Sequence, residues 1–280
     1  MNEWGKWVNK IHCGDVLGIL RQMPDEFVDC IITSPPYWGL RDYGVEEQIG
    51  LEPTLEEYLK KLLAVTAELK RVLKPTGVCF WNHASNYKNK CDMLQNYRLI
   101  LRMIDEQGWI LRNIIIWHKP NHMPSSAKDR FTNAYEPVFM LVKSQKYWFD
   151  LDAVRIPHRT NVSGLPGHLD RKEEIDNWRS CPSGPRNLHP AGRNPGDVWT
   201  VPTQPFPEAH FATFPERLVE PMIKAGCPPN GVVLDPFMGS GTVAKVATRL
   251  RRQWIGIELN PEYVEIAYRR LNGTQLEMFT

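Results

Sequence analysis

The chain has 280 residues, of which 42% are hydrophobic and 24% are charged, a composition typical of globular proteins rather than disordered or fibrous ones. No run approaches the roughly 20 apolar residues of a membrane-spanning helix, and residues 1–10 lack the apolar stretch of a signal peptide. We therefore expect a cytoplasmic protein with no membrane partner. The formal net charge of +2 neither requires nor excludes a polyanionic partner.

The first 150 residues alternate apolar runs with helical patterns. Residues 27–32 form an apolar run that ends at a proline pair, which predicts a strand followed by a tight loop. Thr54 and Glu57 form a capping box at the start of a helix that we expect to stop at residues 74–77. Further strands are expected at residues 78–81, 113–117 and 137–142.

A second helix is expected between the first two of these strands. Its predicted apolar face carries Leu94, Tyr97, Leu101 and Ile104, and Gly108 ends it.

Residues 151–208 differ from both flanking stretches. They contain nine prolines and five glycines without sustained periodicity, which predicts loop-rich structure. Six arginines are interleaved with two tryptophans there, a composition suited to phosphates and base edges. The candidate DNA-binding residues of this segment are Arg155, Arg159, Arg186 and Arg193.

Regular patterns return near residue 211. A helix to about residue 226 and a strand at 231–234 are expected, then a helix at 242–250 and a strand at 254–258, and finally another helix. Alternating strands and helices predict an α/β fold with a mostly parallel sheet and helices on both faces.

Six cysteines are spread along the chain without a C-x-x-C pair, so the spacings of zinc-ligand and redox motifs are missing. We expect all six to be buried, reduced thiols, and we expect no metal site. They are Cys13, Cys30, Cys79, Cys91, Cys181 and Cys227.

A glycine-rich loop between an apolar strand and a helix is the first candidate binding site. Such a turn lets backbone N–H groups approach a ligand at the positive end of the helix dipole. The next strand ends at Glu258, where a carboxylate can accept hydrogen bonds from both ribose hydroxyls of an adenosine, and Asn260 caps the following helix. The candidate residues of the loop are Asp235, Pro236, Phe237, Gly239, Ser240, Gly241 and Thr242.

A dinucleotide and S-adenosylmethionine both carry the adenosine that this site would bind. The loop has only the Gly239–Gly241 pair instead of the full G-x-G-x-x-G spacing, and it has no P-loop lysine. These departures favour S-adenosylmethionine.

A second candidate loop consists of Ser34, Pro35, Pro36 and Tyr37 and follows a predicted buried strand. The exocyclic amine of a nucleobase is a poor nucleophile because its lone pair is delocalised into the ring. The Ser34 hydroxyl and the Pro35 carbonyl can hold the amino hydrogens and direct the lone pair at a methyl group, while Tyr37 offers a face for stacking.

Together these motifs resemble those of amino-group DNA methyltransferases of the permuted, beta-type class, in which the catalytic motif precedes the cofactor motif. Residues 33–38 resemble the catalytic motif, and residues 235–242 resemble the cofactor loop. Residues 12–16 resemble the stretch whose acidic residue, here Asp15, meets the adenine. The other similar stretches are residues 211–218, with Phe214 in the helix that closes the methionine end of the pocket, 117–121 and 135–137.

The resemblance implies a Rossmann-like methyltransferase fold of about seven mostly parallel strands, S-adenosylmethionine as cofactor and double-stranded DNA as substrate. Residues 1–150 and 209–280 would form the catalytic and cofactor-binding halves of one domain, and residues 151–208 the target-recognition segment. The target base would be flipped out of the duplex into the pocket. Arg41, in a loop expected over the DNA, and Lys119 complete the DNA-binding candidates.

The family relates the residue before the proline pair to the target base. Serine there is found more often with cytosine N4, whereas aspartate or asparagine is typical of adenine N6, so Ser34 favours cytosine and leaves adenine as the alternative. Methylation at cytosine carbon 5 is disfavoured, because that chemistry needs a thiolate, usually in a Pro-Cys pair, and the sequence has no such pair.

Two less favoured functions stay open at this point. They are an RNA or protein-amide methyltransferase and a catalytically silent DNA-binding relative. A homodimer and a cognate restriction endonuclease are open as partners of an enzyme of prokaryotic or phage origin.

Overall fold

The structure is a computed structural model that describes residues 3–42, 44–45, 47–158, 189–204 and 214–277. The chain divides into two compact units, residues 1–149 with 197–280 and residues 150–196. Among the described residues, no helix has the length and apolar character needed to cross a membrane.

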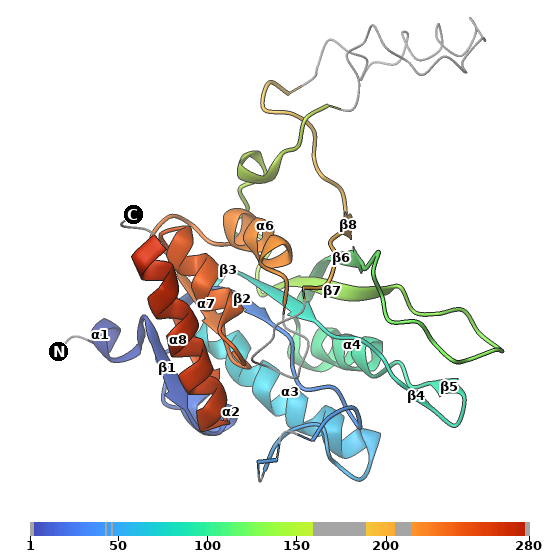
Figure 1. The fold of residues 1–280 in the computed structure, drawn as a ribbon. Coiled ribbons are helices and arrows are strands. Elements are labelled where there is room, and N and C mark those ends of the chain that lie inside the picture. The colour runs from blue at the N-terminus through green and yellow to red at the C-terminus, as the bar shows by residue number, and fades with distance from the viewer. Residues whose placement is uncertain (1–2, 43, 46, 159–188, 205–213, 278–280) are drawn as a thin grey trace, which may run out of the picture. The chain divides into compact units, whose positions relative to one another are not determined.

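The larger unit is built on an eight-stranded mixed sheet (Figure 1). Its strands are β1 (Lys10–Cys13), β2 (Val28–Thr33), β3 (Leu73–Asn82), β6 (Ile110–His118), β7 (Tyr135–Val142), β8 (Val198–Thr200), β9 (Val232–Asp235) and β10 (Gln253–Glu258). They lie in the order β1-β10-β9-β2-β3-β7-β6-β8. The five strands from β1 to β3 are parallel, whereas β7 is antiparallel to both of its neighbours. The short strand β8 adds an eighth member to the seven or so that we expected.

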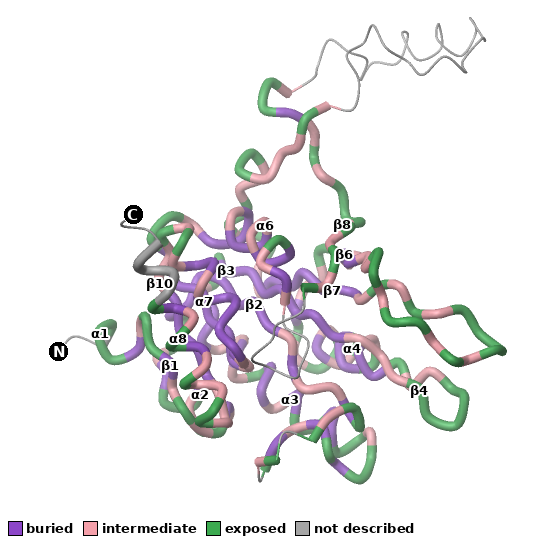
Figure 2. Tube along the Cα trace, in the orientation of Figure 1, coloured by how far each residue is buried: buried purple, intermediate pink, exposed green. Residues whose placement is uncertain are grey.

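Helices cover both faces of this sheet. They are α1 (Glu3–Trp7), α2 (Val16–Leu20), α3 (Leu55–Val72), α4 (Gln95–Gln107), α6 (Glu216–Gly226), α7 (Thr242–Arg249) and α8 (Pro261–Glu277). One core joins α2, α3 and α4 to strand residues such as Ile31 and Trp81, and the other joins α6, α7 and α8 to Cys30 and Phe80. Neighbouring strand residues point to opposite faces and both faces are covered, so the central strands are buried and mostly apolar (Figure 2).

Local sequence signals explain where two helices begin and end. The predicted capping box of α3 is confirmed, with Glu57 N donating to Thr54 Oγ1 and Thr54 N donating to Glu57 Oε2, both at 3.2 Å. Gly108 ends α4 as expected, in a left-handed conformation with φ of 65°.

The apolar face predicted for α4 is wrong at two positions. Leu94 precedes the helix and Leu101 points to solvent, with 44% and 58% of their surfaces exposed. The buried face carries Leu99, Ile100 and Met103 instead. The first turn is anchored by side-chain hydrogen bonds to residues 83–86, and this anchor sets the rotation of the helix.

The expectation that all cysteines are buried is also wrong. Cys13 ends the edge strand β1 and Cys91 lies in a small hairpin, β4 (Tyr87–Lys88) with β5 (Cys91–Asp92), and both are exposed. Three others, Cys30, Cys79 and Cys227, are buried free thiols whose pKa values are raised by burial. Cys181 lies outside the described residues.

The helix predicted from residue 211 begins later. Phe214 and Pro215 are not helical, and α6 starts at Glu216, because Pro215 takes an extended conformation and its carbonyl accepts the first bond of the helix, from Leu218 N at 2.9 Å. Residues 211–213 lie outside the described part of the chain.

The smaller unit is described at residues 150–158 and 189–196. A short 3-10 helix, η1 (Asp152–Val154), is followed by an antiparallel bridge between Ile156 and Arg193, whose backbones exchange hydrogen bonds of 3.0 and 2.9 Å. Arg155 Nε donates to Asp152 Oδ1 at 2.6 Å.

Candidate active site

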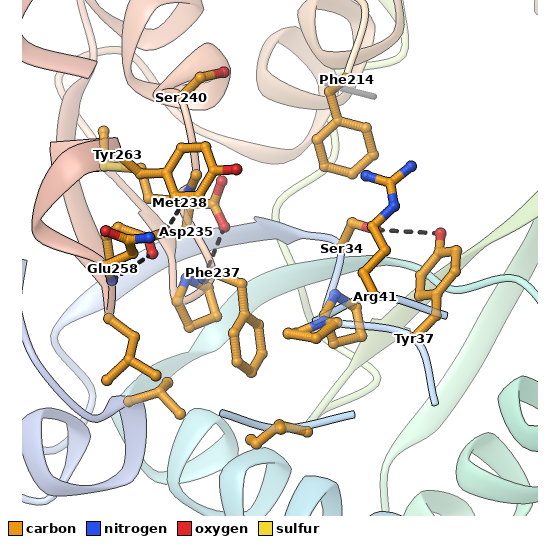
Figure 3. Close-up of a pocket in the computed structure, with 18 of the residues that line it drawn as sticks. Ser34, Tyr37, Arg41, Phe214, Asp235, Phe237, Met238, Ser240, Glu258 and Tyr263 are labelled. Carbon is orange, nitrogen blue, oxygen red and sulfur yellow. Dashed lines mark hydrogen bonds between the residues drawn. The ribbon is translucent and has the colours of Figure 1, made fainter. Parts of the chain in front are cut away.

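A cavity of about 300 Å³ lies at the carboxyl ends of the parallel strands, where the antiparallel β7 begins (Figure 3). Its lining includes all four predicted catalytic residues and every predicted cofactor residue except Gly241. They are Ser34, Pro35, Pro36, Tyr37, Asp15, Phe214, Asp235, Pro236, Phe237, Gly239, Ser240, Thr242, Glu258 and Asn260.

Glu258 ends β10 and is held by the backbone. Gly239 N donates to its Oε2 at 2.7 Å and Asn260 N donates to its Oε1 at 2.8 Å, while burial raises the pKa of the carboxyl. A carboxylate offers about four acceptor sites, so it keeps capacity for a ligand that carries hydroxyl groups. The carboxylate is therefore fixed in direction before any ligand arrives.

Asp235 ends β9 and lies buried beside the catalytic loop. Its Oδ1 accepts hydrogen bonds from Thr33 Oγ1 at 2.8 Å and from Phe237 N at 3.1 Å. Burial raises the pKa of Asp235 to about 7, and the neighbouring carboxylate of Glu258 acts in the same direction. A cationic ligand group in this cavity would favour the ionised form of Asp235.

Two further predicted residues cap helices at the rim of the cavity. Asp15 Oδ2 accepts from Gly18 N at 2.7 Å at the start of α2, and Asn260 Oδ1 accepts from Glu262 N at 2.9 Å at the start of α8. Gly241 precedes α7 with φ of 82°, and a Cβ there would lie 3.0 Å from the Ala267 side chain. Gly241 therefore packs against Ala267 of α8 and does not line the cavity.

A chain of side-chain hydrogen bonds runs through the catalytic loop. Ser34 Oγ donates to Tyr37 Oη at 3.2 Å, and Tyr37 Oη donates to Glu136 Oε2 at 3.0 Å. Asn82, at the end of β3, donates from Nδ2 to Tyr37 Oη at 2.8 Å and to Glu136 Oε2 at 2.9 Å. Burial, with the charge of Glu136, raises the pKa of Tyr37 well above its usual range, so the phenol stays neutral and can donate.

The proline pair is braced from the side of α3. Tyr58 Oη donates to the Pro36 carbonyl at 2.8 Å and lies 2.9 Å from His83 Nε2. Burial lowers the pKa of His83 to about 3, so the imidazole is neutral, and its Nε2–H can donate to Tyr58. This pair fixes the backbone of the loop rather than touching the cavity.

Glu136 also binds the cation predicted to contact DNA. Lys119 Nζ forms an ion pair with Glu136 Oε1 and lies 4.1 Å from the centroid of the Trp117 ring. The antiparallel pairing of β6 with β7 brings these side chains together. A contact between Lys119 and DNA stays a prediction, and its ammonium already has an acidic partner.

Three residues take part in the site without a predicted role of their own: Asn82, Glu136 and Thr33, the first residue of the motif at 33–38. Asn82 ends β3, and the neighbouring parallel strand β2 ends just before Ser34. The position of both residues at the ends of neighbouring strands is the signal that could have identified Asn82. For Glu136 the only signal was the resemblance of residues 135–137 to a recurring stretch.

The other DNA-binding candidates are spread over the chain. Arg41 lines the cavity (Figure 3). Arg155 and Arg193 belong to the smaller unit, where Arg155 also donates to the Gly192 carbonyl at 3.1 Å. Arg159 and Arg186 lie outside the described residues.

The residues of the cavity fit S-adenosylmethionine. The fixed carboxylate of Glu258 suits ribose hydroxyls and Asp235 suits a cationic group. Aromatic rings, including Phe214 and Phe237, also line the cavity (Figure 3). Within the described ranges, no group of three or more His, Cys, Asp or Glu side chains could hold a metal ion.

Comparisons with known proteins agree with this geometry. The family model for N6/N4 methyltransferases, described as DNA methylase, matches residues 28–269. The Type II methyltransferase M.Cfr9I of Citrobacter freundii is 42% identical over 93% of this chain and 86% of its own length. The DNA adenine methyltransferase YhdJ of Escherichia coli (strain K12) is 31% identical over 96% of this chain and 85% of its own.

Solved structures give the same result. The PvuII DNA methyltransferase, titled cytosine-N4-specific, superposes with a TM-score of 0.71 at 25% identity, over 93% of this chain and 85% of that one. A DNA modification methylase from Thermus thermophilus, solved with S-adenosyl-L-methionine, superposes with a TM-score of 0.61 at 25% identity, over 94% and 95% of the two chains.

Proposed function

The chain belongs to the N6/N4 family of DNA methylases and uses S-adenosylmethionine, and we propose that its methyl acceptor is the N4 amine of cytosine in double-stranded DNA. The observation that carries this proposal is Ser34, which stands before the proline pair and lines the cavity. Among the relatives, the PvuII enzyme is cytosine-N4-specific and YhdJ is an adenine methyltransferase, so adenine N6 is the alternative.

The cofactor half of the cavity holds the methyl donor. Glu258 would bind the ribose, Asp15 would face the adenine, and Asp235 would face the cationic amino-acid end. When bound, S-adenosylmethionine supplies an electrophilic methyl group, so the protein need only position and deprotonate the acceptor.

The catalytic half orients the target amine. Because Ser34 donates its own proton to Tyr37, its lone pairs are available to accept an amino hydrogen of a flipped base. The acceptor nitrogen gains a methyl group and must lose one proton. The bonds from Ser34 through Tyr37 to Glu136 connect that nitrogen to a carboxylate, and Pro35 and Pro36 keep the backbone fixed.

Recognition of the DNA sequence is the second part of the proposal. We assign it to residues 151–208, with Arg155, Arg159, Arg186 and Arg193 as its contacts, and we assign Arg41 to the DNA next to the cavity. Exchange of this segment with that of a relative should move the methylated site, and an unchanged site would rule the assignment out. The proposal also includes a cytoplasmic enzyme, a homodimer and a cognate restriction endonuclease, as in restriction-modification systems.

Nucleoside analysis tests the choice of base. The protein is incubated with S-adenosylmethionine and unmodified DNA of mixed sequence, and the digested nucleosides are analysed by mass spectrometry, with the Ser34→Ala variant as control. N4-methylcytosine that is lost in the variant supports the proposal. N6-methyladenine would overturn the choice of base and keep the family.

A further inference from the structure

Two loops leave the sheet at the edge where the cavity lies. Residues 83–94 follow Asn82 and contain the β4–β5 hairpin, and residues 119–135 run from the end of β6 to Tyr135, the first residue of β7. Asn82, Lys119 and Glu136 all line the cavity. We call these two loops together the paired arm. They extend from the sheet side by side (Figure 1).

The two loops of the paired arm brace each other. The guanidinium of Arg130 lies 4.0 Å from the centroid of the Tyr87 ring, and Lys90 Nζ lies 2.6 Å from Asp129 Oδ2. At the root, Asn96 Nδ2 donates to the His83 carbonyl at 2.9 Å. The paired arm is therefore built from contacts between its loops and with the helix beneath them.

Positive charge is concentrated on the paired arm. Its 29 residues hold five basic and two acidic side chains, a formal net charge of +3, or +2 when the ion-pair partner of Lys119, Glu136, is included, whereas the whole chain carries +2. All other residues together therefore sum to −1, or to zero when Glu136 is counted with the paired arm. Lys128 and Arg130 are both exposed. A polyanion is the partner that such a surface favours.

Apolar side chains are exposed on the same surface. Phe131 has 96% and Met123 has 86% of its surface exposed, the two highest values among the large hydrophobic residues of the described chain. Much of the surrounding surface of both loops is also open to solvent (Figure 2). Exposed apolar residues among cations are what a DNA groove accepts, since phosphates meet the cations and sugars or base edges meet the apolar groups.

We propose that the paired arm is a second DNA-binding surface, separate from residues 151–208, and that it holds the duplex beside the flipped base. Lys128 and Arg130 contact phosphates, and Phe131 packs in a groove. The inference rests on duplex DNA as the substrate of this family, and it does not depend on which base is methylated.

Binding of a short fluorescein-labelled DNA duplex of mixed sequence, measured by anisotropy across a salt series, tests the charged part. The double variant Lys128→Ala with Arg130→Ala should lower the slope of log Kd against log salt by about two, one for each phosphate contact. The matched control is Lys146→Ala, because Lys146 is exposed and follows the end of β7 that points away from the cavity. Its slope should equal that of the unsubstituted protein.

The apolar part gives a different signature. Phe131→Ser should weaken binding about tenfold, the order expected for one aromatic contact with DNA, and should leave the salt slope unchanged. Affinity and slope that match the unsubstituted protein in both sets of variants would overturn the proposal.

Sedimentation velocity of the same proteins distinguishes the rival occupant, a second copy of this chain. A Phe131→Ser variant that dissociates a dimer while it keeps full DNA affinity would assign this surface to dimer formation and overturn the proposal. Failure of the proposed base choice would appear instead in the methylated nucleoside, which this binding assay does not read.

Discussion

The two halves of the cavity are held together in different ways. In the cofactor half, backbone amides close in sequence fix the carboxylates, as Asn260 does for Glu258 and Phe237 does for Asp235. In the catalytic half, side chains bind one another over long separations, and Tyr37 and Glu136 are 99 residues apart in the chain. The first half is therefore set mainly by backbone amides, with the Thr33 hydroxyl as a long-range partner of Asp235, whereas the second consists of side chains that meet only when separate strands are assembled.

The largest expected effect is in the catalytic half. Ser34→Ala should slow methyl transfer by about 100-fold or more, because it removes the group that holds the target amine, and cofactor affinity should stay nearly unchanged. Single-turnover rates compared with calorimetric titration of S-adenosylmethionine measure both quantities. Normal turnover by this variant would remove Ser34 from the mechanism.

A double-mutant cycle tests whether the long-range bonds act as one unit. Glu136→Gln and Tyr37→Phe should each lower the single-turnover rate by about tenfold or more, and the double variant should be little slower than either one. Each change keeps the shape of the side chain, and thermal unfolding checks that the fold is intact. Independent, multiplicative effects would mean that Tyr37 and Glu136 do not share a proton path.

The cofactor half should respond in binding rather than in rate. Glu258→Ala should weaken S-adenosylmethionine binding by about 1 to 3 kcal/mol, as expected when hydrogen bonds to a buried carboxylate are lost. The single-turnover rate at saturating cofactor should change little. Glu262→Ala is the control, since Glu262 is an exposed acid four residues away. Equal losses in both variants would show that Glu258 is not a specific ligand.

The last prediction concerns protonation of Asp235, which acts on stability rather than on binding or rate. Its pKa is raised to about 7 by burial, so between about pH 4 and pH 7 the folded protein keeps a proton that the unfolded chain has released. The free energy of unfolding should therefore fall as pH rises through this range, by about 1 kcal/mol per pH unit, and level off above it. Denaturant unfolding without cofactor measures this slope.

Asp235→Asn supplies the control for that slope. The amide does not titrate, so the contribution of residue 235 should be missing from its stability profile. Parallel pH profiles for the variant and the unsubstituted protein would mean that Asp235 titrates at its ordinary pKa in the folded chain.

The same contrast explains what could be predicted from sequence. The turn from Asp235 to Thr242 and the strand end at Glu258 are contiguous patterns, and both lie at the cavity as expected. The meeting of Asn82 with Glu136 could not be predicted, because it depends on the antiparallel insertion of β7 beside β3.

Local patterns failed where tertiary contacts overrode them. The helix near Leu101 was predicted correctly, but its rotation depends on polar contacts of its first turn with residues 83–86, which no periodicity reveals. Strand β1 was not predicted, because four residues of mixed burial give too short a pattern.

The pairing of β1 with β10 has a consequence for synthesis of the protein. Lys10 of β1 lies opposite Ile255 of β10. On one side, β2 pairs with β9, about 200 residues later in the chain. A nascent chain leaving the ribosome can pair β2 with β3 early, yet β1 and the other edge of β2 stay unpaired until β9 and β10 emerge. Both β9 and β10 must therefore be synthesised before the methyl donor can bind, and chains that stop before them expose strand edges that promote aggregation.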